Sequence, residues 1–159
     1  AARGNHSMSV AAVASMTSRS SGDRGLIFIA VAMHNIGICA TQRLAPISFQ
    51  KATAQADELS PTHAVERQLL GWDHGEPGET ILKQWRLSEE IQAVARYHHD
   101  ADQQLDSPHA EAIYSVAIAN YLCRRSGRTA ITGDNLNPPR NAVFKRLNIG
   151  VDLLNILAQ

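Results

Sequence analysis

The chain has 159 residues, a length typical of one domain whose core needs no disulfides. Hydrophobic residues make up 44% of it, which excludes a disordered chain, and fifteen basic residues balance fifteen acidic ones. This balance gives the chain no overall attraction to nucleic acid or to an anionic membrane, so we expect neither as a partner.

Several features favour a cytoplasmic protein. The longest apolar run, from Leu26 to Met33, is too short to cross a bilayer, and the first residues have no signal-peptide pattern. The two cysteines, Cys39 and Cys123, form no metal-binding or redox motif, and we expect both to be reduced thiols in the core. We therefore expect a single domain over residues 1–159 in the cytoplasm.

Helical patterns dominate the chain, and no run of residues has the alternation of a strand. Asp23 is a suitable N-cap, Ser60 followed by Pro61 opens a helix, and Gly127 is a suitable helix end. Segments 100–108 and 127–138 have the composition of loops. We predict an all-α, single-domain helical bundle with helices at 6–17, 24–39, 43–56, 61–70, 75–86, 88–99, 109–126, 139–147 and 151–158.

Five of the predicted helices carry a histidine or asparagine on their apolar stripe. A buried imidazole or amide without a partner costs roughly 1–3 kcal/mol, so five separate cases would be expensive. Helical offsets place all five on core-facing sides, which favours a shared metal or ligand cluster over separately satisfied side chains. These residues are His6, His34, His74, His98 and Asn120.

The other histidines give weaker signals. His63 and His109 lie near helix starts, and we expect both at the surface. His99 adjoins His98, and periodicity does not decide which of the two points inward. The basic cluster Arg124, Arg125 and Arg128 suits a solvated helix end that complements the helix dipole, with a phosphate site as the alternative.

Four short motifs in order resemble the HD superfamily of metal-dependent phosphohydrolases, and more closely its HDOD subgroup of signalling domains. After His6 they are Met33-His34-Asn35-Ile36-Gly37, Asp73-His74-Gly75-Glu76-Pro77-Gly78, Tyr97-His98-His99-Asp100 and Ala119-Asn120-Tyr121. The resemblance implies a helical bundle of the HD type. It also implies metal-ligand positions at His6, His34, Asn35, His74, His98 and Asn120, with His99 as a tentative ligand-binding residue.

The departures from the family pattern concern its chemistry. Asn35 and Asn120 stand where the superfamily has ligand aspartates, and Ile38 stands where active HD-GYP relatives have lysine. No Gly-Tyr-Pro follows His98-His99, and the sequence starts only five residues before His6, without the helical lobe that precedes this position in HDOD domains. Neutral amides cannot bridge two cations by charge, so the site is expected to be vestigial or weak and we assign no catalytic residue.

Two states of the site remain open at this point. The side chains either form a satisfied polar network with no metal, or hold one divalent ion such as zinc, nickel, manganese or iron.

Three functions follow from these states. The leading hypothesis is a non-catalytic signal-transduction or scaffold domain whose partners are other signalling proteins or domains. The alternatives are a metal-dependent phosphohydrolase or nucleotide phosphodiesterase, and a domain that binds a nucleotide second messenger without cleaving it.

Overall fold

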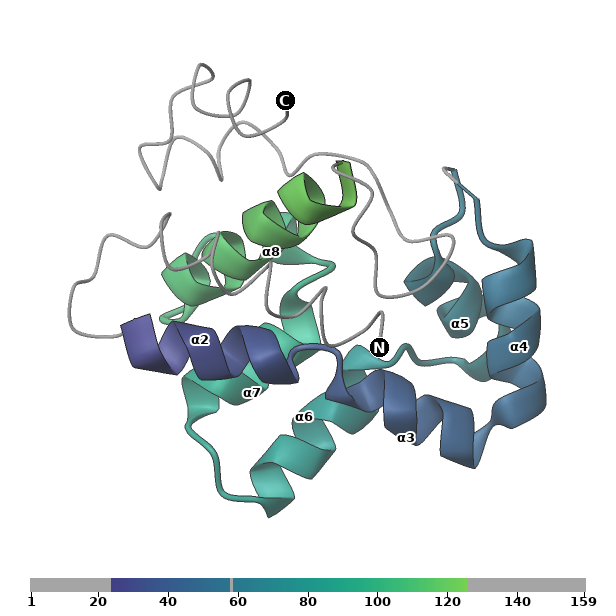
Figure 1. Ribbon diagram of the computed structural model, residues 1–159, viewed down its shortest axis with the longest axis horizontal. Helices are drawn as coiled ribbons and strands as arrows, with labels where there is room; N and C mark the ends of the chain where they lie inside the picture. The colour runs from purple at the N-terminus through teal and green to yellow at the C-terminus, as the bar shows by residue number, and fades with distance from the viewer. Residues whose placement is uncertain (1–23, 58, 126–159) are drawn as a thin grey trace.

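The structure is a computed structural model that describes residues 24–57 and 59–125 (Figure 1). These residues form helices without a strand among them, so the all-α prediction is confirmed. The predicted helices 6–17, 139–147 and 151–158 lie outside the described residues, as do the predicted loop 127–138, His6 and Arg128. The elements are α2 (Arg24–Met33), α3 (Ile36–Leu44), α4 (Pro46–Gln55), α5 (Thr62–Leu70), α6 (Gly75–Gln84), α7 (Glu89–Tyr97), the 3-10 turn η1 (Ala101–Gln103) and α8 (Ala110–Arg125).

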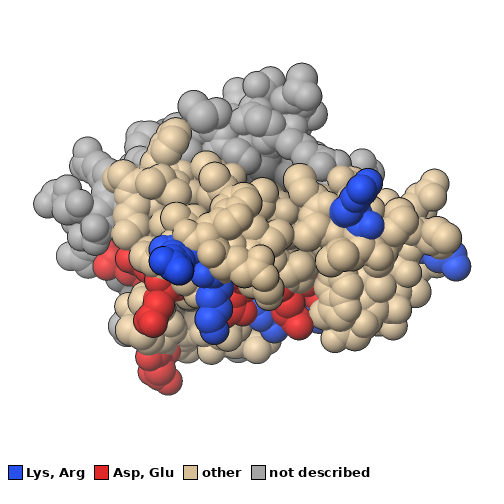
Figure 2. All heavy atoms as spheres, turned by 90° about the horizontal axis from the view of Figure 1, so that it is seen from below, with Lys and Arg blue, Asp and Glu red and all other residues tan. Residues whose placement is uncertain are grey.

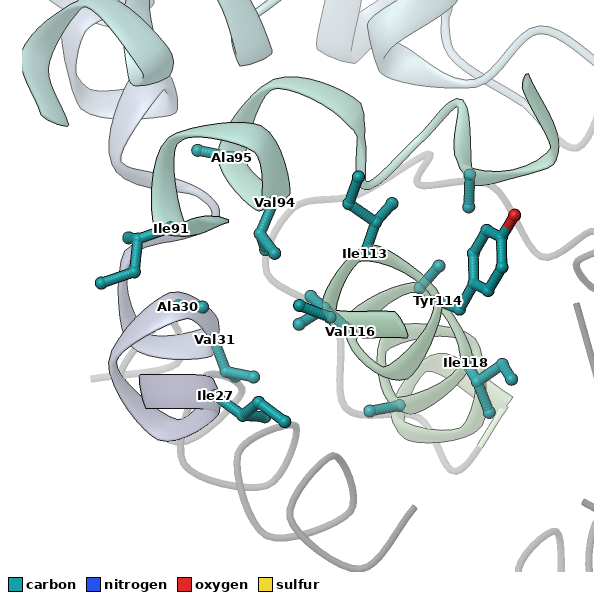
Figure 3. Packing of buried hydrophobic residues seen from close by; sticks show 14 of the residues in the cluster. Ile27, Ala30, Val31, Ile91, Val94, Ala95, Ile113, Tyr114, Val116 and Ile118 are labelled. Carbon is teal, nitrogen blue, oxygen red and sulfur yellow. The ribbon is translucent and has the colours of Figure 1, made fainter. Parts of the chain in front are cut away.

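The core lies where α2, α7 and α8 meet. Side chains from all three helices point toward one another there, among them Val31, Val94 and Ile113 (Figure 3). Residues 112–120 of α8 are all buried, as expected for a helix at the centre of a fold. A separate, smaller core consists of Ile38 and Phe49, which join α3 to α4.

The predicted single helix 24–39 is wrong, because the chain turns at His34 and Asn35 and divides it into α2 and α3. The cause is a tertiary contact with α6. A Cβ atom on Gly37 would lie 1.7 Å from the carbonyl oxygen of His74, so the two backbones touch where α3 crosses α6. This crossing brings the end of α2 next to the start of α6.

The direction of α3 also shows that the expected burial of one cysteine was wrong. Gly37, Ile38 and Thr41 are the buried residues of α3, and Cys39 lies on its other side, exposed. Cys123 is buried in the core as expected, and neither cysteine forms a disulfide.

The stretch Gly25–Leu44 is long and apolar enough to cross a membrane by length and composition. Core helices of water-soluble proteins pass the same criterion, and this stretch contains the turn at His34 and the main-core residues Ile27 and Val31. We therefore interpret it as part of the core. On the face seen from below, acidic and basic side chains are interspersed (Figure 2), in line with the balanced composition.

Candidate functional site

Five imidazole rings meet at the ends of α2 and α7 and the starts of α5 and α6. His98 lies 4.9 Å from His34, 5.7 Å from His74 and 4.0 Å from His99 between ring centroids. His99 in turn lies 4.9 Å from His74 and 4.1 Å from His63. The structure thus brings together His34, His74 and His98, which the sequence pattern singled out, with His99 and His63. We call these five residues the imidazole cluster.

Backbone carbonyl groups set the orientation of two of these rings. The Nδ1 atom of His34 lies 2.6 Å from the carbonyl oxygen of Val31, and that of His98 lies 3.0 Å from the carbonyl oxygen of Ala95. A carbonyl oxygen can only accept, so each Nδ1 carries the proton and donates it. A neutral ring that donates from Nδ1 has its lone pair at Nε2, the usual arrangement of metal-binding histidines.

A buried carboxylate sets the orientation of the His74 ring. One oxygen of Glu66 accepts from the His74 backbone N–H at 3.0 Å and from its Nδ1 at 2.7 Å. The Nε2 of His74 faces the Nε2 of His99 at 3.0 Å. Glu66 is fully buried on the inner face of α5. The sequence reading missed it, although an acid three residues after His63 on the same helix face was a usable signal.

Arg67 pairs with the two other acidic residues that flank the imidazole cluster. It forms ion pairs with Asp73, which precedes His74, and with Asp100, which follows His99. Its second nitrogen donates to Asp100 at 3.2 Å. Asp73 also accepts from the backbone N–H of Gly75 at 2.7 Å. These contacts tie α5 to the start of α6 and the end of α7.

Two expectations about exposure were wrong. His63 is only 7% exposed, because its ring stacks on His99 with an interplanar angle of 13°. Burial, followed by the neighbouring His74, lowers the pKa of His63 to about 4. Burial and the adjacent rings also lower the pKa values of His98 and His99 well below the ordinary value. These rings are therefore neutral near pH 7. His109, expected at the surface, is half-buried.

The two amides at the family's aspartate positions lie in the interior. Asn120 is 3% exposed on α8, and Asn35 is half-buried beside His34. Among the described residues, neither Asn35 Nδ2 nor Asn120 Oδ1 has a hydrogen-bond partner. Arg124 follows Asn120 by one turn and is 6% exposed, which corrects the expectation of a solvated helix end. The i,i+4 spacing places both side chains on one face of α8.

The donor set fits one transition-metal ion better than two. His34, His74 and His98 each have an Nε2 lone pair, and nitrogen atoms of His74, His98 and His99 lie within 4.8 Å of one another. Imidazole suits zinc, nickel or iron, whereas manganese, also considered from the sequence, prefers oxygen ligands. Bridging two ions calls for a carboxylate. Asp73 and Asp100 form ion pairs with Arg67, and Glu66 binds His74 through one oxygen, which leaves its second oxygen as the one carboxylate atom beside the cluster without a hydrogen-bond partner among the described residues. The role of these residues as metal ligands stays a prediction.

Comparisons with known proteins agree with this fold. The model of the HDOD domain family matches residues 3–101. A protein of Treponema pallidum (strain Nichols) without an assigned function is 29% identical over 115 residues, which cover 67% of this chain and 21% of that protein. The chain thus spans about a fifth of this relative.

Solved structures show the same likeness. A "putative signal transduction protein" from Marinobacter aquaeolei VT8 has a TM-score of 0.74 at 19% identity, covering 95% of this chain and 33% of that one. An HDOD domain protein with unknown function from Geobacter sulfurreducens has a TM-score of 0.69 at 22% identity, covering 96% and 50%. A "putative phosphohydrolase" from Shewanella amazonensis SB2B has a TM-score of 0.69 at 18% identity, covering 98% and 56%.

Proposed function

The chain belongs to the HDOD family, and we propose that it is a non-catalytic signal-transduction or scaffold domain with a degenerate HD-type metal site. The observation that carries this proposal is that amides occupy the two positions where the superfamily has ligand aspartates, while Asp73 and Asp100 beside the imidazole cluster form ion pairs with Arg67. Asn35 and Asn120 are amides, Glu66 binds His74, and Arg67 binds the two acids on either side.

Phosphodiester hydrolysis needs an activated water and positive charge that clamps the phosphate, usually from two bridged metal ions. Each lost aspartate removes one negative charge that would hold such ions. Replacing two of them leaves neutral nitrogen ligands, which hold one borderline ion but do not bridge a pair. This supports binding without turnover.

The single-ion state is compatible with the proposal. His34, His74 and His98 would hold the ion through Nε2, and a bound ion would supply Lewis-acid polarisation of a ligand oxygen. The chain's own contribution is orientation, because Val31, Ala95 and Glu66 accept from the three Nδ1–H groups and so leave Nε2 of each ring as the acceptor atom.

The competing candidate is a metal-dependent phosphohydrolase. The three preset Nε2 lone pairs favour it, since such a set has the form of a metal site and not of a general polar core. The missing carboxylates weigh against it. The proposed setting is the cytoplasm, and the proposed partners are other signalling proteins or domains.

Elemental analysis together with a phosphodiesterase assay in added Mn²⁺ tests the proposal. We expect no turnover by the natural chain and at most one bound ion per chain. The Asn35→Asp/Asn120→Asp double variant should bind more Mn²⁺ because it restores two charges. Turnover by the natural chain with stoichiometric metal, abolished in His34→Ala, would overturn the non-catalytic proposal.

A further inference from the structure

Helix α5 contacts both rings of the His74–His99 pair from one face. Its His63 stacks on the ring of His99, with the ring centroids 4.1 Å apart and an interplanar angle of 13°. Its Glu66 accepts from the backbone N–H and from the Nδ1 of His74. The i,i+3 spacing of His63 and Glu66 places both side chains on the same side of α5. One helix therefore contacts two rings that lie 25 residues apart in the chain.

A third residue of α5 connects the chain neighbours of the two rings. Arg67 forms ion pairs with Asp73, which precedes His74, and with Asp100, which follows His99. The stack, the carboxylate and the guanidinium thus hold the segments that carry His74 and His99 together from one side. We call His63, Glu66 and Arg67 the α5 clamp.

The ring protons decide what the α5 clamp does to a metal site. Glu66 accepts from Nδ1 of His74, so the lone pair of the neutral His74 ring is at Nε2. The Nε2 of His99 lies 3.0 Å from that atom. Two lone pairs would repel each other at this distance, so the single ring proton of neutral His99 is on Nε2 and is donated to His74. His99 therefore occupies the lone pair of His74 that a metal ion would need.

The hydrogen bond from His99 and a metal ion compete for the same atom of His74. We propose that the α5 clamp holds a closed, ion-free state of the imidazole cluster in which His99 blocks His74, and that a bound ion displaces His99 and loosens α5. His99 is then a competitor of the ion and not one of its ligands. The inference rests on the proposed function, since it needs a site that binds an ion without turnover, and it gives that site an output in the position of α5.

The packing of α5 suits such a movement. Its main neighbour is α4, and the main hydrophobic core of the described residues contains no residue of α5. Segments with few contacts to the core open at a lower free energy than the core itself. The loss of a few polar contacts can therefore shift α5 while α8 keeps its place.

Isothermal titration calorimetry with Zn²⁺, on chain stripped of metal by EDTA and then dialysed, measures this competition. His99→Phe keeps a ring that stacks on His63 but can neither donate a proton to His74 nor bind an ion. We expect it to bind Zn²⁺ about three- to tenfold more tightly than the natural chain, the scale of one lost hydrogen bond. Gln68→Ala, an exposed residue of α5, is the control and should leave the Zn²⁺ affinity unchanged.

The opposite sign identifies a ligand. Weaker Zn²⁺ binding by a His99→Phe variant that circular dichroism shows to be folded would make His99 a ligand and overturn the proposal. Absence of Zn²⁺ binding in both the natural chain and His99→Phe would overturn it as well.

Two measurements on the natural chain need no substitution. Long-range ¹H–¹⁵N NMR spectra of the imidazoles report which ring nitrogen is protonated, and in EDTA we expect Nδ1–H in His74 and Nε2–H in His99. A proton on Nδ1 of His99 would refute the blocking hydrogen bond. With saturating Zn²⁺, amide hydrogen exchange should accelerate in residues 62–70 and stay unchanged in the centre of α8. Unchanged or slower exchange in α5 would refute its release.

The two proposals fail separately. A ligand role for His99 leaves the non-catalytic proposal untouched, because that proposal depends on the phosphodiesterase assay. Turnover in the phosphodiesterase assay overturns the non-catalytic function whatever the Zn²⁺ affinity of His99→Phe is.

Discussion

Glu66 is the residue on which the geometry of the cluster depends most directly. Its carboxylate accepts from two donors of His74, the backbone N–H and Nδ1, and both lie in the interior. Glu66→Ala leaves these donors without a partner, and at roughly 1–3 kcal/mol for each group we expect a loss of about 2–6 kcal/mol in the free energy of unfolding. Glu66→Gln keeps an acceptor and should lose less.

Urea unfolding followed by circular dichroism measures both variants. Gln68→Ala, an exposed residue on the same helix, is the control and should change stability by less than about 0.5 kcal/mol. A Glu66→Ala variant as stable as Gln68→Ala would contradict the role given to the buried carboxylate.

Single residues also mark how far the sequence could predict the site. The positions of His34, His74, His98 and Asn120 on apolar stripes predicted burial, and all four are buried. His63 was not predicted to be buried because its burial comes from the ring of His99, which follows α7 and is distant along the chain, and no local pattern reports such a contact. The expectation for Arg124 was wrong because a basic residue near a helix end is usually solvated, whereas Arg124 is only 6% exposed.

At the scale of the elements, α5 stands apart from the main core. It packs extensively against α4, and α4 joins the rest of the fold through α3 (Figure 1). The contact of α5 with the cluster is polar, through His63, Glu66 and Arg67 on one helix face. The state of the cluster and the position of α5 are therefore linked by few, charged contacts.

Arg67→Met tests this link. It leaves the buried Asp73 and the half-buried Asp100 without their shared cation, and we expect a loss of about 1–3 kcal/mol. Amide hydrogen exchange should accelerate in residues 59–70 and stay unchanged in the centre of α8. Adding Asp73→Asn should recover part of the loss, since it removes a buried charge for which only the longer 3.9 Å ion pair with Arg96 would remain. Uniform acceleration over both helices would argue against a separate α5.

The break between α2 and α3 depends on Gly37. Periodicity alone predicted a continuous helix, because the apolar pattern runs on through the turn and the cause of the break is a contact with α6. Gly37→Ala should therefore cost more than about 3 kcal/mol, since a Cβ atom would overlap the backbone of His74. Gly25→Ala meets open space and should be neutral or stabilise by up to about 1 kcal/mol. Thermal unfolding compares the two, and equal melting temperatures would refute the contact.

At the scale of the whole molecule, the all-α class could be predicted because helical periodicity is a local property, repeated along most of the chain. The sequence could predict that these side chains face a common core. It could not predict which rings touch, since the distances between the rings depend on how α5, α6 and α7 pack. One consequence of that packing concerns the entire fold: several imidazoles are held neutral in the interior, while in the unfolded chain they titrate near the ordinary value of 6.5.

The free energy of unfolding should therefore decrease as the pH is lowered from 6.5 to about 4. Above pH 6.5 the rings are neutral in both the folded and the unfolded chain, so their protonation does not change the free energy of unfolding. Below it the unfolded chain binds protons that the folded chain does not, and the loss continues down to about pH 4 for His63. That single ring accounts for roughly 3 kcal/mol over the window. Urea unfolding in EDTA at several pH values should show the decline, and His63→Gln should make it shallower, with His98 and His99 still contributing, while His109→Gln leaves it unchanged. Equal slopes for the two variants would mean that His63 is not held neutral by the fold.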